Sequence, residues 1–287
     1  AATLAVTRGE ALSALSRRPE AMEALTAGLR LTNDPSLKGR ALVALAHVYR
    51  AIGNEKEAAR LANEAMTVLA TLPLDRSLPA ALLLAANTQQ QAARPDEAHR
   101  LFRQCIAVAE GQDASDMVAM AEGGLGGLLA EEGQLEDALE YLEREGSYQR
   151  VYGTARQLVP VLYRIAITLR RLGRPDEALV CLDEADDAAR FARLPYERAR
   201  ADAGRAAVHL ACGDIDGAQT LLERRRVAYD PDADAVLRLA YREVEAGVQL
   251  ARGDRQAALA VFHAAESEAS QGGFDGTAAF FLGMTGV

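Results

Sequence analysis

The stretch Gly53-Asn54-Glu55-Lys56-Glu57-Ala58 decides the fold, because it recurs with small changes every 40 residues along the chain. Its later copies occupy 93–98, 133–138, 173–178, 213–218 and 253–258, and each ends on an alanine. A fixed period of roughly 20–50 residues indicates a solenoid, in which each unit packs mainly on its neighbours. Solenoids usually present a binding surface, so the period also predicts a role in molecular recognition.

Each period has the pattern of two amphipathic helices joined by this turn. Ahead of the first copy, Leu42, Leu45 and Tyr49 recur at three- and four-residue steps and form one apolar stripe. Gly53 suits the left-handed conformation that is common just past a helix C-terminus. Asn54 is a favourable N-cap for the helix that follows. The pattern therefore predicts a helical hairpin in every unit.

The composition favours an all-α fold and limits the classes of partner. Of the 287 residues, 49% are hydrophobic but only 5% are aromatic, which predicts a core built mostly from alanine and leucine. The net charge of −9 argues against a nucleic-acid-binding surface, which is normally basic. No apolar run is long enough to span a membrane. Three unpaired cysteines, Cys105, Cys181 and Cys212, fit a reducing compartment, so we expect a cytoplasmic protein.

The spacing also predicts how the chain is organised. Residues 1–287 are expected to form a single solenoid, with a short first unit at 1–35 and six 40-residue units at about 36–275. A further helix is expected at 276–287, because an apolar stretch runs from Ala278 to Met284. This helix either caps the array or begins another repeat, in which case the chain is a piece of a longer protein.

Within each unit the pattern resembles the tetratricopeptide repeat. Leu42, Leu45 and Tyr49 match its first helix, and Ala98 with Phe102 match its second. The period is longer than the usual repeat of about 34 residues, and the closing proline is absent. Longer units of this kind resemble those in sensor regions of bacterial signalling ATPases and transcription activators, and in kinesin light chains. The resemblance implies a right-handed α-solenoid, a superhelix of antiparallel helix pairs.

The resemblance further implies that the first helix of each unit lines a concave groove. The groove candidates lie between the stripe positions of these helices; they are Arg40, His47, Arg50, Asn87, Gln90, Gly123, Gly127, Tyr163, Arg164, Ile167 and Arg170. Arginine binds carboxylate and phosphate groups through its forked guanidinium, so the expected ligand is a protein, an acidic peptide or a small anionic molecule. The alternative is that these arginines form ion pairs on a solvated helix surface.

Two irregular segments near the middle of the chain allow more than one interpretation. Four glycines stand at Gly123, Gly124, Gly126 and Gly127, and each costs about 1 kcal/mol relative to alanine inside a helix. They serve either close helix packing or a hollow where a ligand approaches the backbone. Downstream, Glu145 replaces an expected small residue. Tyr148 and Tyr152 either fill the resulting gap or flank a pocket.

No group of residues has the spacing that catalysis requires. The four histidines are far apart in the sequence and lack metal-ligand spacing, and the glycine cluster does not follow a strand as a phosphate loop would. We therefore expect a binding module without a catalytic site, a metal or a cofactor. It is expected to be the sensor region of a larger bacterial signalling or transcription-regulatory protein. The alternative is a free-standing scaffold that forms homo-oligomers through the stretch from Ala278 to Met284.

Overall fold

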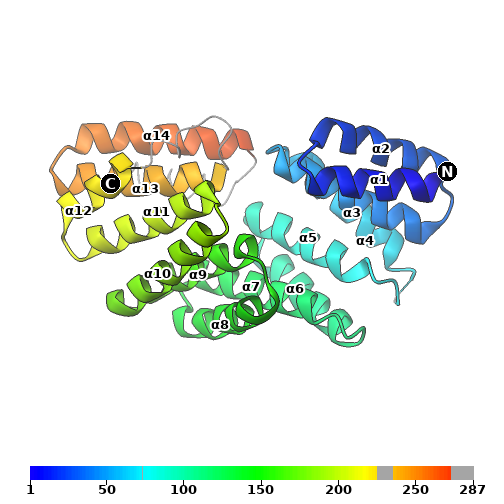
Figure 1. Ribbon diagram of the computed structural model, residues 1–287, viewed down its shortest axis with the longest axis horizontal. Coiled ribbons are helices and arrows are strands. Elements are labelled where there is room, and N and C mark those ends of the chain that lie inside the picture. Colours follow the sequence, from blue (N-terminus) through cyan, green and yellow to red (C-terminus); the bar gives the residue numbers. More distant parts are fainter. Residues whose placement is uncertain (73, 225–234, 273–287) are drawn as a thin grey trace. The chain divides into compact units, whose positions relative to one another are not determined.

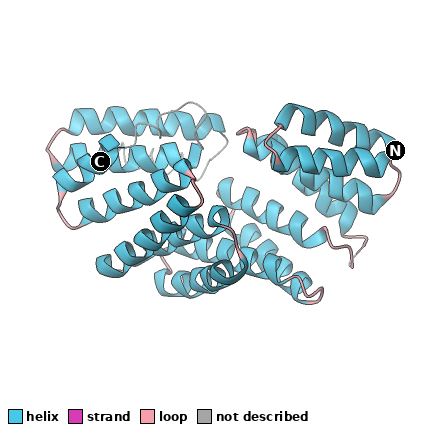
Figure 2. Cartoon of the chain, viewed as in Figure 1, coloured by secondary structure: helices cyan, strands magenta, loops and turns pink. Residues whose placement is uncertain are grey.

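The computed structural model describes residues 1–72, 74–224 and 235–272, and most of them are helical (Figure 2). Within these ranges there is no strand, so the predicted all-α class is confirmed. The helix predicted at 276–287, with its apolar stretch, lies outside the described residues. The chain folds as two compact units, which consist mainly of Ala1–Leu125 and Gly126–Gln271.

The first unit contains three helix pairs and the beginning of a seventh helix (Figure 1). Its helices are α1 (Ala2–Ala14), α2 (Arg18–Leu31), α3 (Pro35–Ala51), α4 (Glu55–Leu69), α5 (Leu78–Gln91), α6 (Pro95–Glu110) and the first part of α7 (Ser115–Glu131). The two helices of each pair pack against each other, and α3 also contacts α5 of the next pair. The first helices of neighbouring pairs therefore lie side by side.

The second unit repeats this arrangement from the end of α7 onward. Its remaining helices are α8 (Leu135–Tyr152), α9 (Ala155–Arg171), α10 (Pro175–Phe191), α11 (Pro195–Ala211), α12 (Ile215–Arg224), α13 (Ala235–Ala251) and α14 (Arg255–Gly272). Helix α11 contacts both α9 and α13, which makes α9, α11 and α13 a layer of first helices.

The turns of the repeated motif adopt the conformations that the sequence predicts. Gly53 has a φ of 78° and lies in the left-handed region, as do the equivalent glycines of four later copies. The second copy has Ala93 at this position, and its φ is 54°. The side chain of Asn54 accepts a hydrogen bond from the backbone N–H of Glu57 at 3.1 Å, which confirms it as an N-cap.

The alanines that close the motif form the most regular part of the core. All six are fully buried; they are Ala58, Ala98, Ala138, Ala178, Ala218 and Ala258. A side chain this small allows the second helix to approach its neighbours closely, which suits hairpins stacked at a constant spacing. The constant position of alanine thus follows from packing.

Close packing also explains two of the four clustered glycines in α7. A Cβ on Gly124 would stand 2.2 Å from Cε1 of Phe102, in the first unit. A Cβ on Gly126 would stand 3.0 Å from the carbonyl oxygen of Ala138 and from Cγ of Leu142, in the second. A side chain at either position would displace a packed neighbour, so the packing interpretation holds for Gly124 and Gly126.

Candidate binding surfaces

In the first unit, the predicted residues of α3 and α5 lie on adjacent helices. His47 is exposed, whereas Arg50, Asn87 and Gln90 are half-buried. Partial desolvation and the nearby charge of Arg50 lower the pKa of His47, so its imidazole is neutral at neutral pH. These four side chains offer a mixed, largely uncharged polar surface, with one cation at Arg50.

Arg40 connects two helix pairs within the first unit. Its guanidinium donates to both carboxylate oxygens of Glu10, at 2.6 and 2.5 Å, and to Oγ1 of Thr7 at 3.0 Å. The two partners lie on α1, so this forked ion pair joins α3 to α1. Its geometry favours the ion-pair interpretation for Arg40, because most of its donors already have acceptors.

The two α7 glycines among the candidates differ in accessibility. Gly123 is buried, so its own surface offers little to a ligand, whereas Gly127 in the second unit is half-buried. On α9, the side chains of Tyr163, Ile167 and Arg170 are all half-buried. They lie at three- and four-residue steps and therefore on one face of α9.

Arg164 is also on α9, but it has a structural partner. It forms an ion pair with Glu145 of α8, whose side chain is only 7% exposed. A buried carboxylate needs such a partner, and this pair explains why glutamate is tolerated where the sequence predicts a small residue. The ion-pair interpretation therefore fits Arg164, as it fits Arg40.

Tyr148 and Tyr152 pack on each other near the end of α8. Their ring centroids are 5.0 Å apart, with planes tilted by 40°. Tyr152 is 73% exposed, so it lies on the surface and does not fill a gap. The neighbouring Val151 is 70% exposed, which makes the end of α8 an apolar surface patch.

Two further residues of the layer of first helices, Arg200 on α11 and Glu243 on α13, were not among the candidates. Desolvation raises the pKa of Tyr163 to about 12; the charge of Glu243 adds to this increase, and those of Arg200 and Arg170 oppose it. Glu243 stands two periods after Tyr163, so the 40-residue register could have identified it. We call Tyr163, Arg170, Arg200 and Glu243 the Tyr163 face.

Three polar groups of this face are poorly matched within the protein. Nε of Arg170 is buried and has no hydrogen-bond partner. Within the described part of the chain, Glu243 and the Tyr163 hydroxyl also lack an ion pair or a hydrogen bond. Arg171 differs, because it donates to the carbonyl oxygen of Ala130 at 2.5 Å. Because Arg170 and Tyr163 are half-buried and Glu243 is exposed, parts of these polar side chains other than the buried Nε reach the surface of the Tyr163 face.

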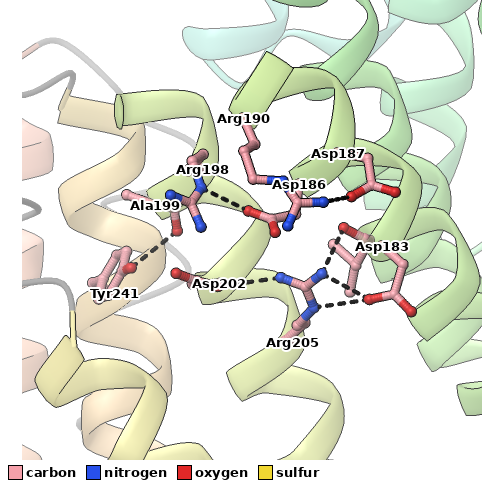
Figure 3. A network of polar contacts seen from close by, with 10 residues as sticks. Asp183, Asp186, Asp187, Arg190, Arg198, Ala199, Asp202, Arg205 and Tyr241 are labelled. Atoms are coloured by element: carbon pink, nitrogen blue, oxygen red, sulfur yellow. Dashed lines mark hydrogen bonds and ion pairs between the residues drawn. The ribbon is translucent and has the colours of Figure 1, made fainter. Parts of the chain in front are cut away.

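A second polar region of this unit is a hollow of about 490 Å³ beside α10, α11 and α12. Its charged lining consists of Asp183, Asp186, Arg198, Asp202, Arg205 and Arg224, which we call the charged hollow. Figure 3 shows the guanidinium of Arg205 between Asp202 and Asp183, and that of Arg198 directed at Asp186. The N–O distances are 2.7 Å from Arg205 to Asp183, 3.2 Å to Asp202 and 2.9 Å from Arg198 to Asp186.

The charged hollow replaces part of an apolar interface. One period earlier, Asp202 and Arg205 correspond to Leu162 and Ile165, which are 0% and 2% exposed in the core. Asp202 itself is only 7% exposed. The side chain of Asp183 is exposed to water. In this unit, charged side chains that pair with one another thus stand where the preceding unit has apolar contacts. The pairing indicates a structural role for most of these side chains.

The described residues limit the chemistry further. Among the ranges 1–72, 74–224 and 235–272, no group of three or more histidine, cysteine, aspartate or glutamate side chains is arranged to hold a metal ion. In the same ranges, no helix has the length and apolar character needed to cross a bilayer.

The stacked helix pairs define the class of protein: a TPR-like α-solenoid, as the repeat pattern predicts. A family model described as the MalT-like TPR region matches residues 2–278. The chain therefore belongs to the family of MalT-like TPR regions. No curated protein sequence matches it significantly.

Solved structures with the same fold have low sequence identity to this chain. A Rap protein in complex with competence and sporulation factor is 15% identical, with a TM-score of 0.66 over 98% of this chain and 72% of the other. The Rap conjugation gene regulator of plasmid pLS20, in complex with the Phr* peptide, is also 15% identical, with a TM-score of 0.68 over 90% and 73%. A tetratricopeptide repeat protein from Parabacteroides merdae is 14% identical, with a TM-score of 0.59 over 98% of both chains.

Proposed function

We propose that this chain is a non-catalytic module that binds an extended peptide or a peptide segment of a protein on its first-helix layer. The observation that carries the proposal is the Tyr163 face, where the buried Nε of Arg170, the Tyr163 hydroxyl and the Glu243 carboxylate have no partner in the described part of the chain. The Arg170 and Tyr163 side chains are half-buried and Glu243 is exposed, so a ligand can reach these side chains even though Nε itself is buried. Polar side chains without internal partners are suited to recognition, because binding satisfies them.

The family and the fold support a regulatory context. MalT-like TPR membership fits a sensor region of a larger cytoplasmic bacterial signalling or transcription-regulatory protein. Two of the structural neighbours are Rap proteins in complex with competence and sporulation factor and with the Phr* peptide. The net charge of −9 favours a peptide over a nucleic acid.

The test is a capture experiment with random synthetic peptides in solution. The immobilised chain and a Tyr163→Ala/Arg170→Glu double variant are exposed to the same mixture, and retained peptides are identified by mass spectrometry. We expect a restricted set of peptides to be retained by the unmodified chain and lost from the double variant. Circular dichroism checks that both proteins have equal helicity.

Two other results of the capture experiment would contradict the proposal. Equal retention by both proteins would show that peptides bind elsewhere on the chain. Retention of no peptide by either protein would overturn the peptide-binding proposal and favour a small anionic ligand.

A further inference from the structure

The charged hollow lies beside two second helices, and α11 forms its floor. Helix α11 contacts both α10 and α12, so it lies between them. Asp183 and Asp186 line the hollow from α10, and Leu221 and Arg224 line it from α12. Its volume of about 490 Å³ lies within the range of small-molecule sites. The hollow thus has an acidic wall on α10 and a wall on α12 that carries an arginine.

The packing of the repeat does not require the charges on this floor. One period earlier, Leu162 and Ile165 stand at the positions of Asp202 and Arg205, and both are buried in the core. Replacing a buried ion pair by apolar residues of similar volume is often neutral or stabilising. Departures from a local packing rule are expected chiefly at functional sites. The charged floor of this unit therefore points to a function beyond packing.

Arg224 has no internal partner in the described part of the chain. Its side chain is exposed, and no hydrogen bond or ion pair within that part holds the guanidinium. Glu184, its counterpart one period earlier, forms an ion pair with Arg150 at 2.8 Å. The residue that corresponds to Arg150 in this unit is Arg190, which pairs with Asp187. The exchange of glutamate for arginine thus leaves the donors of Arg224 available to a ligand.

The two aspartates of the opposite wall each keep an unused oxygen. Oδ1 of Asp186 accepts from Nε of Arg198 at 2.9 Å. Oδ1 of Asp183 accepts from Nη2 of Arg205 at 2.7 Å. Among the described residues, neither aspartate has a hydrogen bond to its Oδ2 atom. A carboxylate oxygen accepts only from a donor, so this wall offers places for an ammonium group.

The charges of the lining balance, because three aspartates and three arginines line the hollow. An anion placed there would face the carboxylates of α10, and a cation would face the guanidinium of α12. A ligand that carries one group of each sign complements both walls without adding net charge. A free α-amino acid is such a ligand, because its ammonium and carboxylate groups are both ionised at neutral pH.

We propose that the charged hollow binds a free α-amino acid, with its carboxylate on Arg224 and its ammonium group on the unused oxygens of Asp183 and Asp186. A guanidinium binds a carboxylate with two parallel hydrogen bonds. Leu221, beside Arg224 on α12, offers an apolar contact to the side chain of the ligand. The hollow shares no residue with the Tyr163 face, so this inference goes beyond the proposed function and does not depend on it.

The test measures the binding of each standard L-amino acid to the unmodified chain by isothermal titration calorimetry. An amino acid that binds is then compared with its N-acetyl form, which lacks the ammonium group, and with its amide, which lacks the carboxylate. The same compounds are titrated into Arg224→Gln and Asp183→Asn. The matched control is Arg30→Gln, because Arg30 is likewise exposed in the last turn of a second helix and has no partner among the described residues.

We expect the unmodified chain and the control to bind the free amino acid roughly tenfold or more tightly than either blocked form. Arg224→Gln should lose the preference for the free acid over the amide, because the guanidinium is gone. Asp183→Asn should reduce the preference over the N-acetyl form, because one of the two carboxylates remains. The comparison of the three forms on the unmodified chain does not depend on the folding of any variant.

Three results would contradict the inference. Absence of binding for every amino acid would overturn it and leave the proposed function standing, because the peptide experiment tests the Tyr163 face separately. Equal binding of the free amino acid and its blocked forms would overturn it, because the two charged groups would then contribute nothing. Undiminished binding by Arg224→Gln would place the amino acid elsewhere on the chain and overturn it as well.

Discussion

The Tyr163 face and the charged hollow lie in the same unit and contain similar side chains, but they arrange them in opposite ways. In the hollow, Arg205 contacts Asp183 and Asp202, and Arg198 contacts Asp186. On the Tyr163 face, Arg170 and Glu243 have no such pair among the described residues. Paired charges mainly maintain a structure, whereas unpaired ones are available to a ligand. Pairing therefore distinguishes the two regions better than composition does.

The largest expected effect on stability is in the charged hollow. Arg205→Ala removes the guanidinium that bridges the buried Asp202 and the carboxylate of Asp183. We expect a loss of about 3 kcal/mol in the free energy of unfolding, measured by urea denaturation, because the buried Asp202 carboxylate loses the guanidinium that joins it to Asp183. Arg190→Ala is the control, since its pair with Asp187 is exposed and contributes at most about 0.5 kcal/mol. Equal losses in the free energy of unfolding for Arg205→Ala and Arg190→Ala would contradict a structural role for the charged hollow.

A second comparison uses two arginines of the same helix. Arg164→Ala leaves the buried Glu145 without its guanidinium, and we expect a loss of about 2 kcal/mol in the free energy of unfolding. Arg170→Gln should change that free energy by less than about 0.5 kcal/mol, because no internal pair is broken. For peptide binding we expect the opposite: Arg170→Gln should weaken it more than Arg164→Ala, when the two variants are compared at equal folded fractions. If Arg170→Gln proves the more destabilising, Arg170 has a structural partner and the comparison fails.

The repeat architecture could be predicted from the sequence because it depends on local signals. The six alanines are all buried, Gly53 adopts a positive φ, and Asn54 caps α4, as the 40-residue motif predicts. These features need only a turn, a cap and a helical period. Arg164 could not be assigned in the same way, because its partner Glu145 lies on another helix and the ion pair exists only once the hairpins are packed.

The candidate site residues show the same limit. Tyr163 and Arg170 follow from the helical register of one unit, but Glu243 and Arg200 required that register to be extended through two further helices. The charged hollow was not predicted, because an aspartate at 202 and an arginine at 205 are ordinary surface residues until α10, α11 and α12 pack around them. Pairing between helices is the information that the linear pattern lacks.

We expect acid to reduce the contribution of the charged hollow to the stability of the fold. Burial alone would raise the pKa of Asp186. The hydrogen bond from Arg198 and the nearby arginine charges together lower it by more than burial raises it, so the pKa is below the ordinary value of 3.8. A depressed folded-state pKa contributes stability above the ordinary value, and that contribution is lost as the pH falls below it. Asp186→Asn should therefore lower stability at neutral pH and reduce its dependence on pH in this acid range. Denaturation curves at a series of acid pH values measure both effects.

The smallest expected effect on the free energy of unfolding is a gain in stability, and it concerns Glu243 on the Tyr163 face. Desolvation raises the pKa of Glu243 above the ordinary value of 4.5, despite the opposing charges of Arg170 and Arg171. The ionised form is then disfavoured in the folded state, and this cost is present at neutral pH and disappears as the pH falls toward 4.5. Glu243→Gln should slightly raise the free energy of unfolding at neutral pH, because the side chain retains exposed surface, and the gain should shrink in acid. A loss of stability at neutral pH would instead indicate that Glu243 is paired within the protein, as the carboxylates of the hollow are, and the distinction between the two regions would not hold.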